Sequence, residues 1–323
     1  MRSPLVQRAL LILAGLVVGG LGSELALRGL GLGPTTDPAP PFVVEPASWV
    51  QPDEVLGFVP APGEFTLRFP DGTAVPVAHD PSGRRATPRV GGAVLEVHGG
   101  SFAYGLGLED SQTLPWLIAD ATTWRVRNHA APGHGPLQAL LSLERAVVSD
   151  EAPDAMVLAY ASFQDERVTV VRNWRRSLAL GGTGLSELPC ARGRRGSPRV
   201  GTCDAGLSPL PLADRLAVVH RLDLAGDVVH NLLVDSHKVT RNLIAHLHGR
   251  AEDAGVRFLL VGLDDDNYTA ETLRWCSERG VPVLDAGLGW RDPRWRLPFD
   301  ATHPNADAQA AWARQIAEAL PAR

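Results

Sequence analysis

The sequence predicts an α/β protein, a three-layer αβα sandwich built on a mostly parallel five-stranded sheet. Apolar runs of strand length lie at residues 93–97, 124–127, 155–160, 257–261 and 281–284, and segments with helical spacing of apolar residues separate them. The first three runs recur about every 31 residues, which is typical of strand–helix–strand units with parallel strands. The second run alternates charged and apolar residues, whereas the first, third and fourth are almost wholly apolar. We therefore expect the second strand at the sheet edge, in the flavodoxin-like strand order 2-1-3-4-5.

Residues 1–33 form an apolar amino-terminal segment. Residues 9–23 carry no charge, and Arg2 and Arg8 precede them. This stretch is shorter than the roughly 20 residues of a spanning helix, but the Arg8 side chain can reach back to the headgroups and lengthen it. We expect an uncleaved transmembrane anchor; a cleaved secretory signal peptide is the alternative, and a buried cytosolic helix is a third interpretation. The first two place the rest of the chain outside the cytoplasm, either membrane-anchored in the periplasm or at the cell exterior, or secreted after signal cleavage.

The remainder divides into two regions. Residues 34–88 are rich in Pro and Gly and contain only short strand-like runs, so we expect a stalk or wrapping segment there. Residues 89–323 are predicted to form the main domain. About 100 residues separate its third and fourth strands, far more than one crossover helix needs, so an insertion is expected at about 172–226.

The chain has three cysteines. Cys190 and Cys203 lie in the insertion, close enough in sequence to form a disulfide in an exported protein, and two free thiols are the alternative. Cys276 lies in a predicted helix, where we expect a small buried apolar residue. Three thiols cannot form a disulfide framework or a four-thiolate metal site.

Charge and histidine spacing exclude other classes of function. The net charge of −5 leaves no basic surface of the kind that nucleic-acid binding needs. His246 and His248 are two apart on a predicted helix and point to different faces, while His230 and His237 lack carboxylate partners at ligand spacing. We therefore expect no metal, no cofactor and no nucleic-acid partner, and we leave the oligomeric state open.

Residues suited to chemistry follow the strands at their carboxyl ends, where ligands bind in open parallel sheets. Ser101 follows the first strand in HGGSFAYG, Gly133 the second in NHAAPGHG, and Gln164 the third in YASFQDE. Asp300 and His303 follow the last strand in FDATHPNADAQ. Their Asp-x-x-His spacing lets the carboxylate bind one ring nitrogen while the other faces the serine. A nucleophilic serine needs such a base and such an orienting acid, so a Ser101–His303–Asp300 triad is predicted.

At these residues the sequence resembles the SGNH, or GDSL-type, hydrolases. The resemblance covers about residues 90–323 apart from the insertion, and EDSQTLPWL after Ser101 is similar to the start of the family's first helix. The lead-in PDEVLGFVPAPG and the apolar amino terminus look like those of membrane-anchored bacterial members. The resemblance implies metal-independent ester hydrolysis or acyl transfer. It also implies an oxyanion hole formed by the N–H groups of Ser101 and Gly133 and the side chain of Gln164.

Two positions depart from the family pattern. The first block has Gly-Gly-Ser where the family usually has Gly-Asp-Ser, although that aspartate is not a chemical group of the reaction. The third block has Gln164 where the family usually has Asn, so the same amide sits on a longer stem. Losing one oxyanion donor costs about a hundredfold to a thousandfold in rate, and a slow or altered enzyme is a consistent expectation.

These observations favour an exported serine esterase or acyltransferase that acts on O-acyl esters, such as acetyl esters, of an envelope glycan or lipid. A catalytically silent module that binds a glycan or a protein through the same cleft, with the Arg-rich insertion as contact surface, is the alternative. His98 and His134 flank the predicted cleft and either contact substrate or satisfy backbone groups. Asp165 is expected to have an ordinary structural role, and a pair with an arginine of the insertion is the alternative.

Overall fold

A parallel five-stranded sheet forms the centre of the protein. The structure, a computed structural model, describes residues 4–34, 42–88, 91–180, 184–193 and 198–320. The sheet contains β6 (Val94–Gly99), β7 (Arg125–Asn128), β8 (Ala155–Tyr160), β11 (Arg257–Asp264) and β12 (Val283–Leu288). Its spatial order is β12-β11-β8-β6-β7 and every neighbouring pair is parallel, which confirms the predicted order and the edge position of the second strand.

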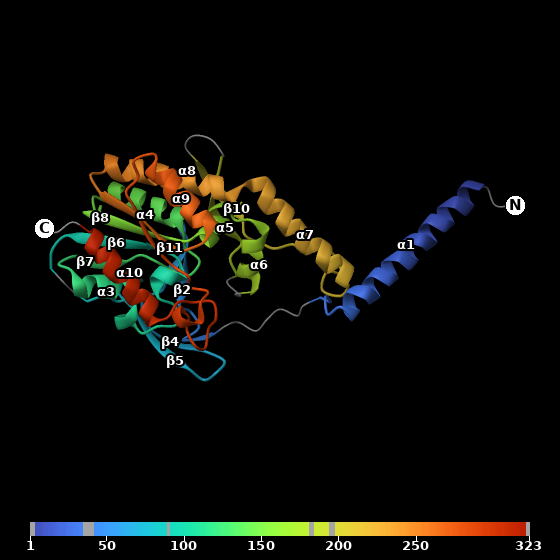
Figure 1. Cartoon of the computed structure of the whole chain (residues 1–323), viewed down its shortest axis with the longest axis horizontal. Helices are drawn as coiled ribbons and strands as arrows, with labels where there is room; N and C mark the ends of the chain where they lie inside the picture. Colours follow the sequence, from blue (N-terminus) through green and yellow to red (C-terminus); the bar gives the residue numbers. More distant parts are fainter. Residues whose placement is uncertain (1–3, 35–41, 89–90, 181–183, 194–197, 321–323) are drawn as a thin grey trace.

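Helices cover both faces of this sheet, so the protein has three layers (Figure 1). One face packs against α3 (Leu114–Ala121) and α10 (Ala306–Ala319), with Trp312 fully buried in that cluster. The other face packs against α4 (Pro136–Val148), α8 (Ser236–Asp253) and α9 (Asn267–Ser277). Strand side chains alternate between the faces, so both layers of helices are needed to cover these strands.

Residues 42–88 wrap onto the sheet. They contribute five short strands: β1 (Val43–Glu45), β2 (Val50–Asp53), β3 (Gly57–Pro60), β4 (Gly63–Arg68) and β5 (Ala74–His79). Leu67 and Val77 belong to the same buried cluster as Leu95 of β6. The buried Arg85 side chain follows these strands and donates to the carbonyl of Gly105 at 2.6 Å. This packing favours a wrapping segment over a free stalk.

The long connection between β8 and β11 carries the additional elements. It contains α5 (Asp165–Thr169), α6 (Arg172–Leu180), the antiparallel hairpin of β9 (Glu187–Arg192) and β10 (Arg199–Asp204), and α7 (Ala217–Val234). A disulfide joins Cys190 to Cys203 across the hairpin, and Cys276 is a buried free cysteine. Four shorter helical turns lie at loops: α2 (Ser101–Tyr104), η1 (Asp110–Gln112), η2 (Ser162–Gln164) and η3 (Pro293–Trp295).

The amino-terminal helix α1 (Pro4–Gly29) projects away from the body of the protein, and α7 lies between them (Figure 1). The segment Val6–Gly29 is long and apolar enough to cross a membrane. Its apolar stretch has a mean hydropathy of 2.1 and is not buried against the rest of the protein. A helix of this kind is consistent with a signal or an anchor.

We predict that the Cys190–Cys203 link is present in the exported protein. Peptide mapping without reduction should give one cross-linked pair of peptides, and alkylation after unfolding should modify Cys276 alone. The bond closes a loop with a sequence separation of 13. Replacing both cysteines by serine is therefore expected to lower the free energy of unfolding by roughly 3 kcal/mol.

The matched control is Cys276→Ala, which should leave the cross-linked peptides unchanged. Free alkylation of Cys190 and Cys203 in exported material would contradict the prediction.

Candidate active site

Ser101 lies at the turn between β6 and α2, and two glycines make this turn possible. Gly99 has a positive φ of 156°, and a Cβ there would lie 2.6 Å from the carbonyl oxygen of Ala159. A Cβ on Gly100 would lie 2.3 Å from a guanidinium nitrogen of Arg167. Because Ser101 is the first residue of α2, its N–H lies at the open end of the helix, where no preceding turn supplies an acceptor.

Asp300 and His303 share one loop just before α10. Asp300 Oδ2 lies 2.6 Å from His303 Nδ1, and Asp300 Oδ1 accepts hydrogen bonds from the backbone and the hydroxyl of Thr302 at 2.8 and 2.5 Å. Burial alone would raise the pKa of Asp300, but the hydrogen bonds from His303 and Thr302 outweigh it and lower the pKa to about 2. The carboxylate is thus charged at neutral pH.

The two loops meet at a single hydrogen bond. His303 Nε2 lies 3.1 Å from Ser101 Oγ, although the residues are 202 positions apart in the sequence. When Asp300 accepts the proton of Nδ1, the lone pair of Nε2 faces the serine hydroxyl, which is the arrangement that lets an imidazole act as a base. The structure therefore brings the predicted serine, histidine and aspartate into one hydrogen-bonded chain.

Gln309 on α10 fixes the distance between the two loops. Its buried side chain donates to the carbonyl of Phe102 at 2.9 Å and accepts from the N–H of Leu114 at 2.8 Å. One amide thus joins α10, which begins just after His303, to the helix that starts with Ser101. The sequence analysis missed Gln309, because its position near His303 gave no sign of partners about 200 residues away.

Gly133 lies in the loop between β7 and α4, in a conformation that requires glycine. Its φ is 90°, and a Cβ there would approach the rings of Phe58 and Trp174 to 2.9 and 3.4 Å. Gln164 lies underneath, fully buried, and its amide nitrogen donates to the carbonyl of Ala159 at 3.2 Å. In this conformation Gln164 has no exposed surface with which to meet a substrate, so its predicted contribution to an oxyanion hole gains no support from its position.

The two flanking histidines have internal partners. His134 Nε2 lies 2.8 Å from the carbonyl of Phe58, and His98 Nε2 lies 3.1 Å from a carboxylate oxygen of Glu96. Both side chains are buried, which favours the backbone-satisfying and structural alternatives over substrate contact. Burial lowers the pKa of His134 to about 4, so this imidazole is neutral at neutral pH.

Asp165 has a structural role, and among the described residues its side-chain partners are not arginines of the insertion. Asp165 accepts from the hydroxyl of Tyr160 at 2.8 Å and pairs with His237 Nδ1 at 3.0 Å. The helix α8 carries His237 onto the face of the sheet where Asp165 is buried, so a residue 72 positions away replaces the nearby arginines. His237 thus has the carboxylate partner that sequence spacing did not reveal.

One buried group combines the residue types of a metal site. Glu96, His98 and His129 place their ligand atoms within 4.8 Å of one another. The Glu96 carboxylate lies 3.1 Å from His98 and 3.2 Å from His129, and Arg127 lies 3.4 Å away. These are also hydrogen-bonding distances, and a guanidinium beside the carboxylate opposes a second cation, so we assign the group a structural role. Glu96 and His129 were missed, although a glutamate inside an apolar strand was a signal of a buried polar pair.

Arg167 is a further residue that the sequence analysis missed. Its guanidinium donates to the carbonyl of His134 at 2.7 Å and lies over the rings of Phe163 and Trp174. Burial lowers its pKa to about 10, which leaves it charged at neutral pH. It therefore supplies a positive charge directly behind the Gly-Gly turn that precedes Ser101.

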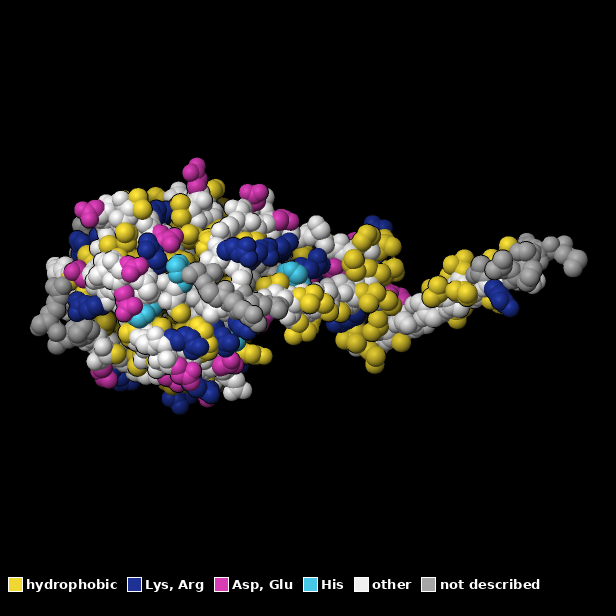
Figure 2. Space-filling model, turned by 90° about the horizontal axis from the view of Figure 1, so that it is seen from above, with side chains coloured by type: hydrophobic (Ala, Val, Ile, Leu, Met, Phe, Trp, Pro, Cys, Tyr) yellow, Lys and Arg dark blue, Asp and Glu magenta, His cyan; other side chains and the backbone are white. Residues whose placement is uncertain are grey.

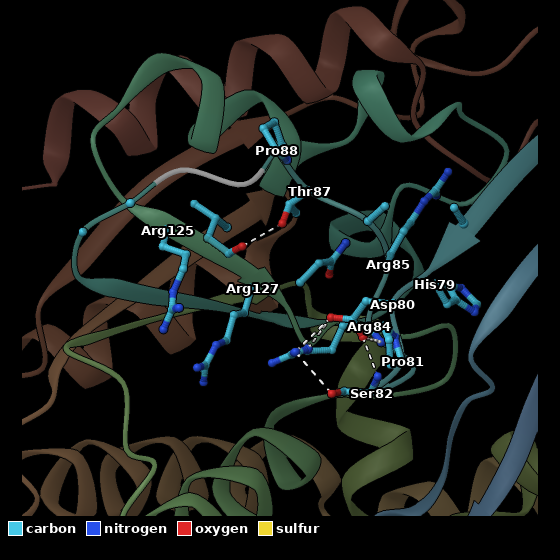
Figure 3. A pocket seen from close by; sticks show the side chains of 16 residues that line it. His79, Asp80, Pro81, Ser82, Arg84, Arg85, Thr87, Pro88, Arg125 and Arg127 are labelled. Carbon is cyan, nitrogen blue, oxygen red and sulfur yellow. Dashed lines mark hydrogen bonds and ion pairs between the residues drawn. The ribbon is translucent and has the colours of Figure 1, made fainter.

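A cavity of about 800 Å³ lies away from the candidate site, against the edge strand β7. Figure 3 shows Arg125 and Arg127 beside the hollow and Arg84 held by Asp80 and Ser82. Ser101, His303 and Asp300 do not line this cavity.

Comparison with known proteins gives matches among solved structures. No protein-family model and no curated protein matches the chain. The chain is similar to a protein of the G-D-S-L lipolytic family from Desulfitobacterium hafniense DCB-2, at 11% identity and a TM-score of 0.43, over 71% of this chain and 100% of that one. For TesA the identity is 16% and the TM-score 0.39, over 69% and 95% of the two chains.

A third likeness is to a carbohydrate esterase family 2 enzyme with a carbohydrate-binding domain from Corynascus thermopiles (Myceliophthora fergusii). Its identity to this chain is 14% and its TM-score 0.41, over 80% of this chain and 70% of that one. At these levels of identity each likeness concerns the arrangement of the sheet and helices.

The lowered pKa of His134 predicts a loss of stability in mild acid. The unfolded chain takes up a proton near pH 6.5, whereas the folded protein resists it until about pH 4. The free energy of unfolding should therefore fall as the pH falls from 6.5 to 4, by roughly 3 kcal/mol from this group. His134→Gln can still donate to Phe58 but does not titrate, so its unfolding free energy, measured in denaturant from pH 4 to 7, should decline less steeply. Equal slopes for the variant and the wild type would contradict the prediction.

Proposed function

We propose that the protein is an exported serine esterase or acyltransferase with Ser101 as nucleophile, His303 as base and Asp300 as orienting acid. One observation carries the proposal: the unbroken hydrogen-bonded chain from Ser101 Oγ to His303 and from His303 to Asp300, at 3.1 and 2.6 Å. A serine, a histidine and a carboxylate in this order are the parts of a nucleophilic triad. Their position at the carboxyl end of a parallel sheet, where ligands bind, adds support.

The reaction proceeds in two halves. His303 Nε2 accepts the Ser101 proton as Oγ attacks the ester carbonyl, and Asp300 stabilises the imidazolium that forms. The tetrahedral intermediate collapses, the ester C–O bond breaks, and the leaving alcohol takes the proton from Nε2. Water or an acceptor hydroxyl then gives its proton to Nε2 and attacks the acyl-serine, which releases the acid or the transferred ester and restores Ser101.

The backbone N–H groups of Ser101 and Gly133 are the proposed donors to the oxyanion. The open helix start at Ser101 and the absence of a side chain at Gly133 support this assignment. For Gln164 we propose a positioning role, because its side chain lies under the loop that carries Gly133 and bonds to the end of β8.

The proposed substrates are O-acyl esters, such as acetyl esters, on a glycan or lipid of the cell envelope. A location outside the cytoplasm supports this class. The apolar helix α1 and the Cys190–Cys203 disulfide both favour such a location, because disulfides persist in oxidising compartments.

Covalent labelling tests the nucleophile. A fluorophosphonate probe should label the full chain, and Ser101→Ala should abolish both the labelling and the hydrolysis of a short-chain aryl ester. His303→Ala should lower kcat by at least a thousandfold, because the serine hydroxyl then lacks its base. Ser149→Ala, an exposed serine at the end of α4, is the matched control and should react like the wild type.

Equal rates in wild type and Ser101→Ala would reject the proposal. Glycan binding that persists in Ser101→Ala, together with no labelling of the wild type, would instead favour a silent binding module.

A substitution at Gln164 separates positioning from chemistry. Gln164→Met keeps much of the volume and removes both amide donors. We expect kcat to fall less than about tenfold, and the melting temperature to fall because the bond to Ala159 is lost. A fall in kcat of a hundredfold or more at an unchanged melting temperature would assign Gln164 to the oxyanion hole instead.

A further inference from the structure

The helix α7 has its polarity reversed relative to an ordinary surface helix. Asp223 and Asp227 are 3% and 5% exposed, whereas Leu222, Val229 and Leu232 are 60%, 53% and 74% exposed. A surface helix of a water-soluble protein normally buries its apolar side chains and exposes its charged ones. The outward face of α7 is thus unsuited to water.

Ion pairs hold the polar face of α7 inward. Arg172 and Arg176 of α6 each pair with both Asp223 and Asp227, at 2.7 to 2.8 Å. These four charges would be costly to separate, because the two aspartates are buried and would lose their charged partners. The apolar face of α7 therefore cannot turn towards the protein without breaking this network.

The amino-terminal end of α7 is attached to α1. Glu24 of α1 accepts hydrogen bonds from the first two N–H groups of α7, Ala217 and Val218, at 2.9 and 3.0 Å. Arg28 donates to the carbonyl of Arg215 at 2.5 Å, and Arg221 donates to the carbonyl of Leu32 at 3.1 Å. The cap from Glu24 satisfies N–H groups that a helix start leaves open.

The length of α1 places this attachment at the surface of a bilayer. The 24 residues Val6–Gly29 extend about 36 Å at 1.5 Å per residue, against a hydrocarbon core of about 30 Å. If α1 crosses with its apolar residues in the core, its last turn, with Glu24 and Arg28, reaches the headgroups. The start of α7 then lies at the same depth.

Exposed apolar side chains continue from α1 into this region. Figure 2 shows hydrophobic side chains gathered on the part of the molecule between the body and α1. They include Leu210 and Leu212 of the preceding loop and Leu222, Val228, Val229 and Leu232 of α7.

We propose that α7 is an interfacial membrane helix, with its Leu222–Val229–Leu232 face inserted in the lipid bilayer next to α1. The proposal rests on α1 being a membrane helix and not on the esterase activity. A helix with one apolar face and one charged face lies in the plane of the membrane interface with its apolar face in the lipid. Here the charged face binds the protein and not the water.

The placement of α6 connects this contact to the candidate active site. Arg172 and Arg176 bind the aspartates of α7, and Trp174, between them in sequence, lies against Gly133 of the candidate site. The helix α6 therefore separates the Gly133 loop from the helix that contacts the bilayer in this proposal.

Depth-dependent quenching tests the proposal in the full chain. In a Cys276→Ala background, Leu232→Cys is labelled with an environment-sensitive nitrobenzoxadiazole probe and reconstituted at one copy per nanodisc in phosphatidylcholine and phosphatidylglycerol. The emission should be blue-shifted, and lipids with a doxyl group on the acyl chain should quench it several-fold. Val148→Cys on α4 is the matched control, because Val148 is apolar and exposed but distant from α1, and doxyl lipids should leave its emission unchanged.

Two outcomes would overturn the proposal. Emission at Leu232 equal to that at Val148 would place α7 in water. A blue shift without doxyl quenching would show that protein and not lipid covers this face. Fluorophosphonate labelling in the same nanodiscs reports on Ser101 separately, so failure of either proposal is distinguishable from failure of the other.

Discussion

Parallel pairing of β6 with both β7 and β8 is the constraint on which the candidate site depends. Parallel strands end at the same edge of the sheet, so the loops that carry Ser101, Gly133 and Gln164 begin within a few ångströms of one another. The loop before α10, which carries Asp300 and His303, must also reach this edge for His303 to contact Ser101. Gln309 secures that approach by binding both the Ser101 helix and the start of α3.

Around this edge the protein buries polar groups and pairs most of them. Burying a charge without a partner is costly, and here specific neighbours form hydrogen bonds or ion pairs with the buried charged groups. Glu96 lies between His98 and His129, and Asp165 lies between Tyr160 and His237. In each group one partner, His129 or His237, comes from an element distant in sequence. Burial would raise the pKa of Glu96, but the hydrogen bonds from His129 and His98 hold it well below its usual range. These groups keep the loops in one arrangement, which a preorganised oxyanion hole requires.

The helices α6 and α7 connect the candidate active site to the amino-terminal helix α1. The helix α6 contacts Gly133 through Trp174 and contacts α7 through two arginines. The helix α7 uses its charged face for that contact, which leaves its apolar face outward and close to α1. The same segment therefore relates the position of the Gly133 loop to the position of the amino-terminal helix.

The sequence by itself determined the features that depend on neighbours along the chain. Apolar periodicity predicted the five strands and their order, and the Asp-x-x-His spacing predicted the contact between Asp300 and His303, because three residues of one turn cannot separate far. The two glycines directly before Ser101 likewise predicted a sharp turn there, because this turn depends only on neighbouring residues. Tertiary structure decided what depends on distant partners: the 3.1 Å approach of His303 to Ser101, the burial of Gln164 and the pairing of Asp165 with His237. It also decided the direction of α7, whose sequence contains both an apolar and a charged face. Which face turns inward depends on the arginines of α6 about 50 residues earlier, and no local pattern encodes that contact.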